Sequence, residues 1–221
     1  MVTFIKNLMK RETRLFNVKG IPMLIFEAPE CISDDIVKYN DFWEYELFNR
    51  WSHLFPKDGL FLDIGANIGS HSLQFKYHFP NVRIWAFELH HENFKVLKYN
   101  LKRYEDVKCF NLGVGSRTSV INYNDGHFSN SGVVKIDSQG NNYNIVLALD
   151  DLNFDEKVCF IKIDIEGHEL SAFEGMENLL VQHSPMIWLE DLNMQGVNYL
   201  KSLGYYIKDF KADTFDYLMC K

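Results

Sequence analysis

The sequence predicts an α/β fold, a doubly wound Rossmann-like sheet of seven strands with a small N-terminal β/α extension. After residue 59, short apolar segments alternate with segments of helical periodicity, and only the five residues Lys211–Phe215 separate the last two apolar segments. Strands that are apolar throughout and joined by helices indicate a parallel sheet covered on both faces. The connection Lys211–Phe215 is too short for a crossover helix, so the last two strands should form an antiparallel hairpin.

Each strand of this sheet is expected where an apolar run is bounded by polar or turn-forming residues. Helical spacing of apolar residues is clearest after the second strand and after the fourth. The five parallel-type strands and the two hairpin strands are expected at Leu60–Ile64, Arg83–Leu89, Val107–Val114, Cys159–Ile165, Met186–Glu190, Tyr205–Phe210 and Asp216–Lys221.

The N-terminal region predicts a β-hairpin followed by one long helix. Thr13–Val18 and Pro22–Ala28 read as short strands that flank a Lys-Gly turn. The helix is expected to begin with Ser33 as its N-cap, because apolar residues then recur at steps of three and four until Pro56. We therefore divide the chain into a hairpin extension, residues 1–32, and a main domain, residues 33–221.

One long segment shows little pattern. Residues Ser116–Asn144 are rich in Asn, Ser and Gly and are expected to form an excursion near the carboxyl edge of the sheet. Its polar side chains His127, Asn130 and Ser131 are candidates for contact with a polar substrate.

Composition and charge narrow the class of protein. Apolar residues make up 47% of the chain, charged residues 24%, and the net charge is −7. No run of Lys or Arg exceeds Lys10-Arg11, which argues against a surface that tracks nucleic acid. The start of the chain is not a convincing signal peptide, and no apolar window approaches the roughly 18 residues of a membrane span.

The four cysteines indicate a reducing, cytosolic compartment. Cys31, Cys109, Cys159 and Cys220 are scattered without a CxxC pair, so we interpret them as reduced thiols of the core. We therefore expect a cytoplasmic protein without a membrane span. The sequence does not indicate an oligomeric state.

The turn after the first strand of the sheet is the expected ligand site, because ligands of open α/β sheets bind beyond the carboxyl ends of the strands. Gly65 and Gly69 frame the turn, but Asn67 stands where a dinucleotide-binding G-x-G-x-x-G motif has its middle glycine. The carboxylate of Asp63 is a poor neighbour for a pyrophosphate and a good one for an ammonium group. S-adenosylmethionine is cationic and carries no phosphate, so the turn favours it over NAD.

Glu88 supports an adenosine ligand. It ends the second strand, 19 residues beyond Gly69, where a carboxylate can accept hydrogen bonds from both ribose hydroxyls. The same residue would serve NAD equally well.

At this point the chain resembles FkbM-type methyltransferases. The segments DIGANIGSHSLQF, AFELHHENFKVLKYNL, LALDDL and IKIDIEGHELSAFEGM resemble, in order, the blocks of that family over roughly Asp41–Glu190. The resemblance implies a class I methyltransferase domain over residues 33–221 that uses S-adenosylmethionine, mostly to O-methylate sugars and other natural-product hydroxyls.

The resemblance also implies a set of cofactor contacts. Glu46, on the helix before the first strand of the sheet, would reach the methionine end of the cofactor, and Leu89 stands where many members have proline. The residues expected to bind the cofactor are Glu46, Asp63, Gly65, Ala66, Asn67, Gly69, Glu88, Leu89 and Gly113.

The fourth strand ends in the candidate catalytic residues. Gly167 lets the chain turn and brings Asp164, Glu166 and His168 together beside the predicted cofactor. His168 is the candidate general base for an acceptor hydroxyl, because its unperturbed pKa lies nearest neutrality. The alternative is that His168 caps or packs against the following helix. His71, just after the glycine turn, is interpreted as a helix-start residue without chemistry.

A metal-assisted mechanism is a second hypothesis for the same edge. Asp164 ends the fourth strand, and Glu190 and Asp191 end the fifth, so three carboxylates could lie together. Such oxygen ligands suit Mg²⁺ or Mn²⁺, which could bind two sugar oxygens and lower the pKa of the acceptor. Alternatively, these acids only solvate the strand ends or bind substrate hydroxyls directly.

The leading interpretation is an S-adenosylmethionine-dependent O-methyltransferase that acts on a sugar or glycan hydroxyl. An NAD-dependent oxidoreductase of the same fold is disfavoured by Asp63 and Asn67. A nucleic-acid N-methyltransferase would usually carry Asn/Asp-Pro-Pro-aromatic where this chain has Asp164-Ile-Glu-Gly. The third alternative is a non-catalytic adenosine-ligand-binding or assembly domain.

Overall fold

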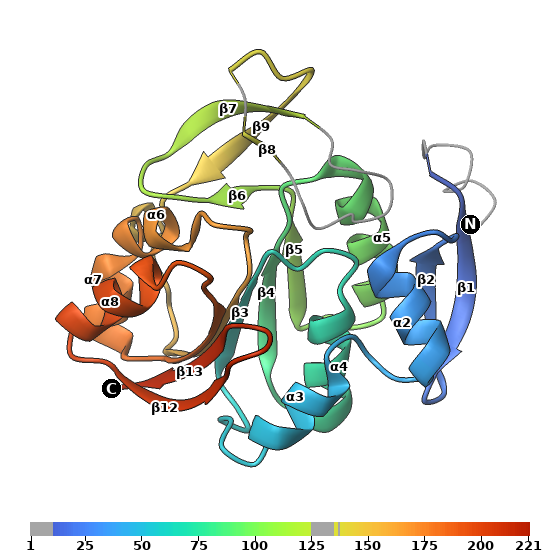
Figure 1. Ribbon diagram of the computed structural model, residues 1–221, viewed down its shortest axis with the longest axis horizontal. Helices are drawn as coiled ribbons and strands as arrows, with labels where there is room; N and C mark the ends of the chain where they lie inside the picture. The colour runs from blue at the N-terminus through green and yellow to red at the C-terminus, as the bar shows by residue number, and fades with distance from the viewer. Residues whose placement is uncertain (1–10, 125–134, 137) are drawn as a thin grey trace.

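A seven-stranded sheet forms the centre of the molecule in the computed structural model, which describes residues 11–124, 135–136 and 138–221 (Figure 1). The strand order is β12-β13-β11-β10-β3-β4-β5, in which the last five are parallel and β13 runs antiparallel to β11 and to β12. The bounds are β3 (Leu60–Ile64), β4 (Arg83–Phe87), β5 (Val107–Phe110), β10 (Val158–Ile163), β11 (Met186–Glu190), β12 (Tyr206–Lys211) and β13 (Asp216–Cys220).

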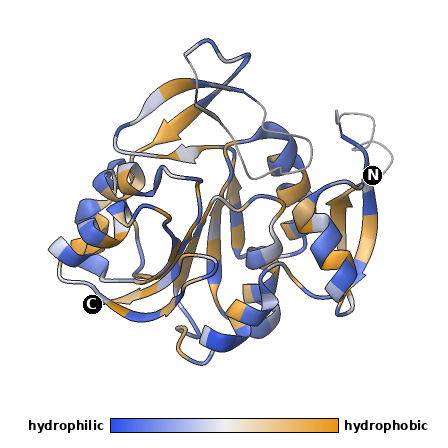
Figure 2. Cartoon of the chain, viewed as in Figure 1, coloured by the Kyte–Doolittle hydropathy of each residue, from blue (hydrophilic) through white to orange (hydrophobic). Residues whose placement is uncertain are grey.

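Helices cover both faces of this sheet, so the predicted doubly wound architecture is confirmed (Figure 1). Figure 2 shows hydrophilic and hydrophobic segments alternating along these helices, as expected for helices that pack one face on a sheet. The helices are α2 (Cys31–Tyr39), α3 (Tyr45–Trp51), α4 (Ser70–His78), α5 (His91–Leu101), η1 (Leu149–Asp151), α6 (Glu169–Glu174), α7 (Glu177–His183) and α8 (Gln195–Ser202).

The strands divide their side chains between two hydrophobic cores. Phe61 of β3 and Phe160 of β10 belong to the core beneath α3, α4 and α5, whereas Leu62 and Ile161, one residue further along, belong to the core beneath α6, α7 and α8. This alternation is the period-two pattern of a strand buried on both faces. It also fixes which polar residues at the strand ends point toward α4.

The N-terminal hairpin is present as predicted and is hydrogen-bonded to α5. β1 (Thr13–Val18) pairs antiparallel with β2 (Ile21–Phe26). Asn100 of α5 accepts a hydrogen bond from Leu24 N at 2.7 Å and donates to Leu24 O at 2.9 Å and to Ile68 O at 2.8 Å. One buried amide therefore joins the hairpin, α5 and the turn that follows β3.

The single helix predicted from Ser33 is wrong, because the structure has two helices with a break between them. Asn40 and Glu44 adopt left-handed φ values of 51° and 55°, which end α2 and precede α3. The N-cap is Glu30, whose carboxylate accepts from Ser33 N at 2.8 Å, while Ser33 Oγ accepts from Phe26 N. The buried apolar residues of both helices belong to the same core, so the apolar spacing continues across the break and hides it.

The predicted third strand and the predicted excursion also need correction. The third strand divides into β5 and β6 (Gly113–Val114), and β6 joins a second sheet of order β6-β9-β7-β8 that Figure 1 shows above the carboxyl edge of the main sheet. Its other strands are β7 (Ser119–Asn124), β8 (Lys135–Ile136) and β9 (Asn142–Leu147). The candidates His127, Asn130 and Ser131 lie outside the described residues.

Two expectations from composition can be compared with the structure. All four cysteines are free, although Cys31 is exposed rather than part of the core. In the described part of the chain, none of the helices has the length and apolar character that crossing a bilayer requires.

Candidate active site

A cavity of about 290 Å³ opens at the carboxyl ends of β3, β4 and β10. Most of the predicted cofactor residues line it. The lining includes Gly65, Ala66, Asn67, Glu88, Leu89, Gly113, Asp164, Glu166, His168 and Glu190.

The glycine turn forms the floor of this cavity. Gly65 has φ +81°, and a Cβ at this position would lie 1.9 Å from the carbonyl oxygen of Asp164. The amides of Gly65 and Ala66 both donate to Phe87 O, at 3.0 and 2.9 Å. The turn is therefore pressed between β10 and β4, and only glycine fits at Gly65.

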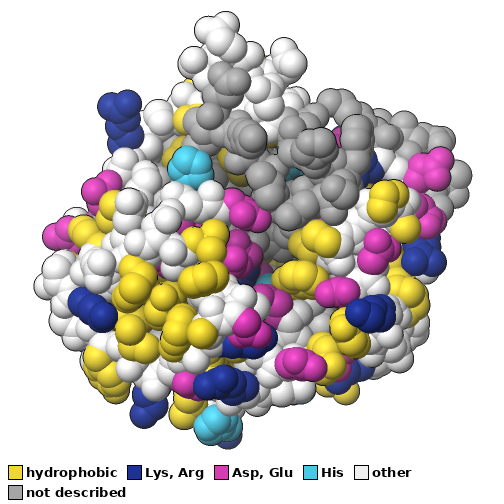
Figure 3. Space-filling model, in the orientation of Figure 1, with side chains coloured by type: hydrophobic (Ala, Val, Ile, Leu, Met, Phe, Trp, Pro, Cys, Tyr) yellow, Lys and Arg dark blue, Asp and Glu magenta, His cyan; other side chains and the backbone are white. Residues whose placement is uncertain are grey.

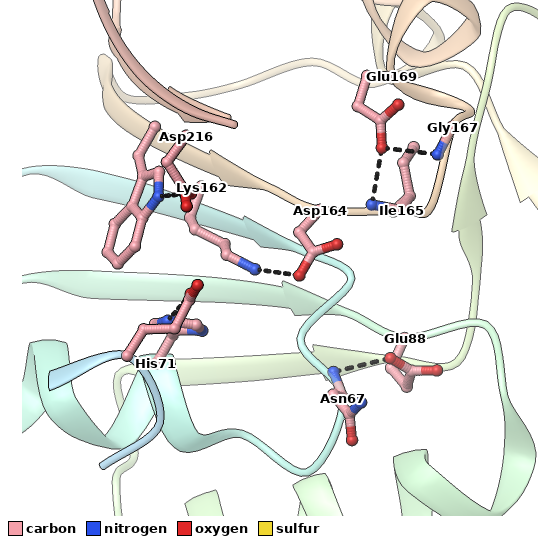
Figure 4. Close-up of polar contacts among 11 residues, drawn as sticks. Asn67, His71, Glu88, Lys162, Asp164, Ile165, Gly167, Glu169 and Asp216 are labelled. Atoms are coloured by element: carbon pink, nitrogen blue, oxygen red, sulfur yellow. Dashed lines mark hydrogen bonds and ion pairs between the residues drawn. The ribbon is translucent and has the colours of Figure 1, made fainter. Parts of the chain in front are cut away.

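Glu88 closes the turn from the side of β4. Its two carboxylate oxygens accept hydrogen bonds from Asn67 N and His90 N, each at 2.7 Å (Figure 4 shows the first). Burial raises the pKa of Glu88 to about 7, although both amide hydrogen bonds lower it. Each oxygen has a second lone pair, so the carboxylate can still accept from a ligand in the cavity.

The cavity wall beyond Glu88 is apolar. Leu89, Leu112 and Val146 line it together with Gly113. A Cβ at Gly113 would lie 3.1 Å from both Leu89 and Val146, so this wall is closely packed. Such a wall suits the flat, weakly polar face of a nucleobase.

The opposite end of the cavity is polar and acidic. Lys162 is buried, and its Nζ lies 3.0 Å from Asp164 Oδ2 (Figure 4). Burial alone lowers the pKa of Lys162, but Asp164, Glu44 and Asp63 outweigh it and raise the pKa above its ordinary value. The ammonium group is therefore held charged by its acidic neighbours.

Two further carboxyl groups interact with Lys162, of which Glu190 lines the cavity and Asp216 does not. Burial, with Asp164 nearby, raises the pKa of Glu190 to about 8. Burial also raises the pKa of Asp216 to about 7, and Asp216 Oδ1 accepts from Trp188 Nε1 at 2.7 Å. Figure 3 shows several acidic side chains at the middle of this face of the molecule.

His71 lines the cavity and Glu44 lies beside it, and the sequence interpretation assigned neither of them to the site. His71 is buried in the cavity wall, with Nε2 at 3.1 Å from Glu44 Oε2 and its ring edge-on to Trp188 at 5.0 Å. His71 lies in the first turn of α4, as expected, and it also lines the cavity. A histidine in the first turn of the helix after a glycine turn was the available signal. The sequence carried no such signal for Glu44, because the position of Glu44 depends on the unpredicted break before α3.

The turn after β10 carries the predicted catalytic residues. Glu166 and Gly167 have left-handed φ values of 56° and 95°. Glu169 Oε1 accepts from Ile165 N and Gly167 N, both at 3.1 Å, so this buried carboxylate holds the turn (Figure 4). Glu166 and His168 are exposed and lie where the turn borders the cavity. The side chain of His168 does not cap α6.

Three predicted cofactor residues do not line the cavity: Gly69, which is the N-cap of α4, and the two acids Asp63 and Glu46. Asp63 is buried beneath α4, and its Oδ2 accepts from Ser72 Oγ at 2.5 Å. Glu46 is exposed and accepts from Tyr45 Oη at 3.1 Å. The lining residues of the cavity include neither of them. Asp63 points toward α4 because residues two apart on a strand share a face, and Phe61 packs in the core beneath α4.

The metal hypothesis is not supported. Within residues 11–124, 135–136 and 138–221, no group of three or more His, Cys, Asp or Glu side chains is arranged to hold a metal ion. Two of the expected metal ligands already have partners. Asp191 accepts hydrogen bonds from Asn193 N and Val197 N, and Asp164 forms an ion pair with Lys162. The carboxylate of Asp191 thus stabilises the start of α8.

The sheet order and the cleft at the glycine turn define a Rossmann-like α/β protein whose ligand site lies at the carboxyl ends of the first strands. The family model for the methyltransferase FkbM domain matches residues 63–211. The chain belongs to this family, and the expected resemblance is confirmed.

Individual relatives cover only parts of the chain. Hexuronic acid methyltransferase AglP from Haloferax volcanii is 27% identical over 128 residues, 56% of this chain and 52% of that protein. AMB antimetabolite synthetase AmbE from Pseudomonas aeruginosa is 32% identical over 100 residues, 44% of this chain and 5% of that protein. This chain thus spans about half the length of the first relative and a small part of the second.

A solved structure shows the same fold. The methyltransferase FkbM from Methylobacillus flagellatus KT superposes with a TM-score of 0.56 at 24% identity. The match covers 75% of this chain and 44% of that chain.

Proposed function

We propose that this methyltransferase transfers the methyl group of S-adenosylmethionine to a hydroxyl of a sugar or glycan acceptor. The proposal is carried by the division of one cavity into an apolar end beside Glu88 and an acidic end around Asp164. An adenosine fits the first end. A cation without phosphates fits the second, where Asp164 and Glu190 line the cavity beside Lys162 and Glu44 lies close enough to raise the pKa of that lysine.

The same features disfavour a dinucleotide. A pyrophosphate requires close approach to the turn, where Asn67 replaces the middle glycine of the dinucleotide-binding pattern. It would also bring negative charge toward Asp164 and Glu190, which lie in the same cavity wall.

The chemistry divides between donor and protein. When bound, the sulfonium of the donor supplies an activated methyl group, whose bond to sulfur breaks as the bond to the acceptor oxygen forms. Glu88 accepts hydrogen bonds from the ribose hydroxyls, and the acidic end stabilises positive charge. His168 takes the proton of the acceptor hydroxyl, because it borders the cavity and is free to reach an acceptor.

Ligand binding tests the donor. S-adenosylhomocysteine should raise the melting temperature of the protein, and NADH at the same concentration should leave it unchanged. The reverse result would contradict the assignment. The acceptor class is then tested by incubating simple glycosides with isotopically labelled methyl donor and searching for labelled methyl ethers by mass spectrometry.

The role of His168 is tested by a matched pair of variants. His168→Asn should lower kcat about 100-fold or more, the usual contribution of a general base, with little change in the Kd of S-adenosylhomocysteine. His53→Asn is the control, because His53 is exposed and does not line the cavity. Equal kcat values for both variants would exclude His168 as the base.

A further inference from the structure

A second cavity of about 160 Å³ adjoins the first. Asp164, Glu166 and Glu190 line both cavities, so the two adjoin at the acidic end where methyl transfer is proposed. The rest of its wall comes from the turn after β10 and from the segment between β11 and α8, including Asn193 and Gln195. The segment between β11 and α8 does not line the first cavity.

All charged residues that line this second cavity are acidic. They are Asp164, Glu166, Glu169, Glu190 and Asp191. Its described lining contains neither Lys, Arg nor His. Lys162, the nearest cation along β10, lines only the first cavity, and its buried ammonium group is already paired with Asp164.

The five acids differ in how much hydrogen-bonding capacity they retain. Glu169 and Asp191 are bound to backbone amides, and Asp164 is paired with Lys162. Within the described residues, the carboxyl groups of Glu166 and Glu190 make neither a hydrogen bond nor an ion pair. These two groups are therefore available to accept hydrogen bonds from a molecule in the second cavity.

The charge of this wall selects among sugars. Hydroxyl and ammonium groups donate hydrogen bonds to carboxyl oxygens, whereas a carboxylate on the sugar would be brought against like charge in a partly buried site. We propose that the second cavity is the acceptor subsite and takes a neutral or amino-substituted sugar rather than one that bears a carboxylate. This inference rests on the proposed function. The name of the relative AglP specifies a hexuronic acid, and this chain is expected to differ from it.

The test compares three acceptors that differ in one substituent: methyl glucopyranoside, methyl glucosaminide and methyl glucuronoside. Binding to the complex with S-adenosylhomocysteine is measured by saturation-transfer NMR, and methylation by mass spectrometry. The neutral and amino glycosides should bind at least about tenfold more tightly than the glucuronoside, a difference of about 1.4 kcal/mol.

A charge introduced on the cavity wall should change this preference. Gln195→Arg places a cation beside the second cavity at an exposed position and should reduce the preference against the glucuronoside at least about fivefold. Asn198→Arg is the matched control, because Asn198 is exposed on the same helix and does not line the cavity. Neither variant should change the Kd of S-adenosylhomocysteine.

The outcomes separate this inference from the proposed function. Tighter binding of the glucuronoside, no binding of the other two glycosides, or equal effects of the two arginine variants would overturn the inference. Failure of S-adenosylhomocysteine to bind, or binding of glycosides without methylation, would overturn the proposed function. The selectivity of the cavity would stand in the second case.

Discussion

At the residue scale, Glu88 has two tasks at the tip of β4. Its carboxylate fixes the glycine turn through Asn67 N and also faces the cavity. Glu88→Ala should raise the Kd of S-adenosylhomocysteine about tenfold or more, because hydrogen bonds to a charged group are each worth about 1.5–3 kcal/mol. Isothermal titration calorimetry measures the change. An unaltered Kd would exclude a ribose contact by Glu88.

A second prediction concerns the contribution of Glu44 to binding of the cationic methyl donor. Glu44 lies beside His71 and acts on the pKa of Lys162, whereas Glu46 faces solvent. Glu44→Gln should weaken binding of cationic S-adenosylmethionine about fivefold, or about 1 kcal/mol, because one negative charge is lost. Glu46→Gln removes the same charge two residues later and should leave the Kd unchanged. A larger effect of Glu46→Gln would restore the sequence-based assignment.

The positions of some site residues could be predicted from the sequence, and those of others could not. Glu88 could be predicted because a residue at a strand tip has a fixed place relative to the glycine turn. Asp63, two residues before Gly65, could not be placed, because its direction depends on strand parity and on the Ser72 hydroxyl across the core. Glu44 lies beside His71 and Glu46 faces solvent because Glu44 has a left-handed φ immediately before α3. Such backbone turns of non-glycine residues leave little trace in the sequence.

At the element scale, the turn between β3 and α4 depends on close contact with β10. Gly65→Ala would place a methyl group 1.9 Å from Asp164 O, at a φ of +81°. Gly20→Ala has a similar φ of +87° but would meet nothing within 4 Å. The Gly20 variant should lose about 1 kcal/mol of stability from backbone strain alone, and the Gly65 variant at least about 3 kcal/mol.

Urea denaturation of both variants measures this difference. The Gly65 variant should also lose affinity for S-adenosylhomocysteine, since the clash moves the turn away from β10. Equal losses of stability in the two variants would show that the turn tolerates a Cβ and that φ alone requires glycine.

Elements with strong periodicity were predicted correctly, and elements defined by distant partners were not. The parallel strands and the C-terminal hairpin follow from continuous apolar runs and a short connection. The second sheet escaped prediction because β7 and β9 expose apolar side chains: Val120 is 68% exposed and Tyr143 71%. A half-exposed sheet above the carboxyl edge lacks the inward alternation by which strands are recognised.

At the scale of the whole molecule, burial of several carboxyl groups at one edge links stability to pH. The pKa of Glu88 is raised to about 7 by burial, from an ordinary value of 4.5. Between these two values the folded protein holds a proton that the unfolded chain has released, so the free energy of unfolding falls as pH rises. The loss begins near pH 4.5, is complete above about pH 7, and amounts to about 3 kcal/mol for Glu88.

Other titratable groups change the free energy of unfolding, some over the same pH range as Glu88 and some outside it. Asp216 and Glu190, with pKa values raised to about 7 and about 8, add losses of the same sign. Hydrogen bonds from Arg50 lower the pKa of Asp209 to about 2, so its contribution is lost only in acid, below this range. The raised pKa of Lys162 affects stability only at high pH. A comparison of two proteins that differ only at Glu88 therefore isolates its contribution.

Urea denaturation of the wild type and of Glu88→Gln between pH 5 and pH 8 makes this comparison. The glutamine variant starts less stable, because an amide offers only one oxygen to the two backbone N–H groups of Asn67 and His90. Its stability should nevertheless fall less steeply with pH, by about 2 kcal/mol over this range, since the variant has no proton to release at residue 88. Parallel curves would show that Glu88 ionises near its ordinary pKa, and the carboxylate would then be charged before any ligand enters the cavity.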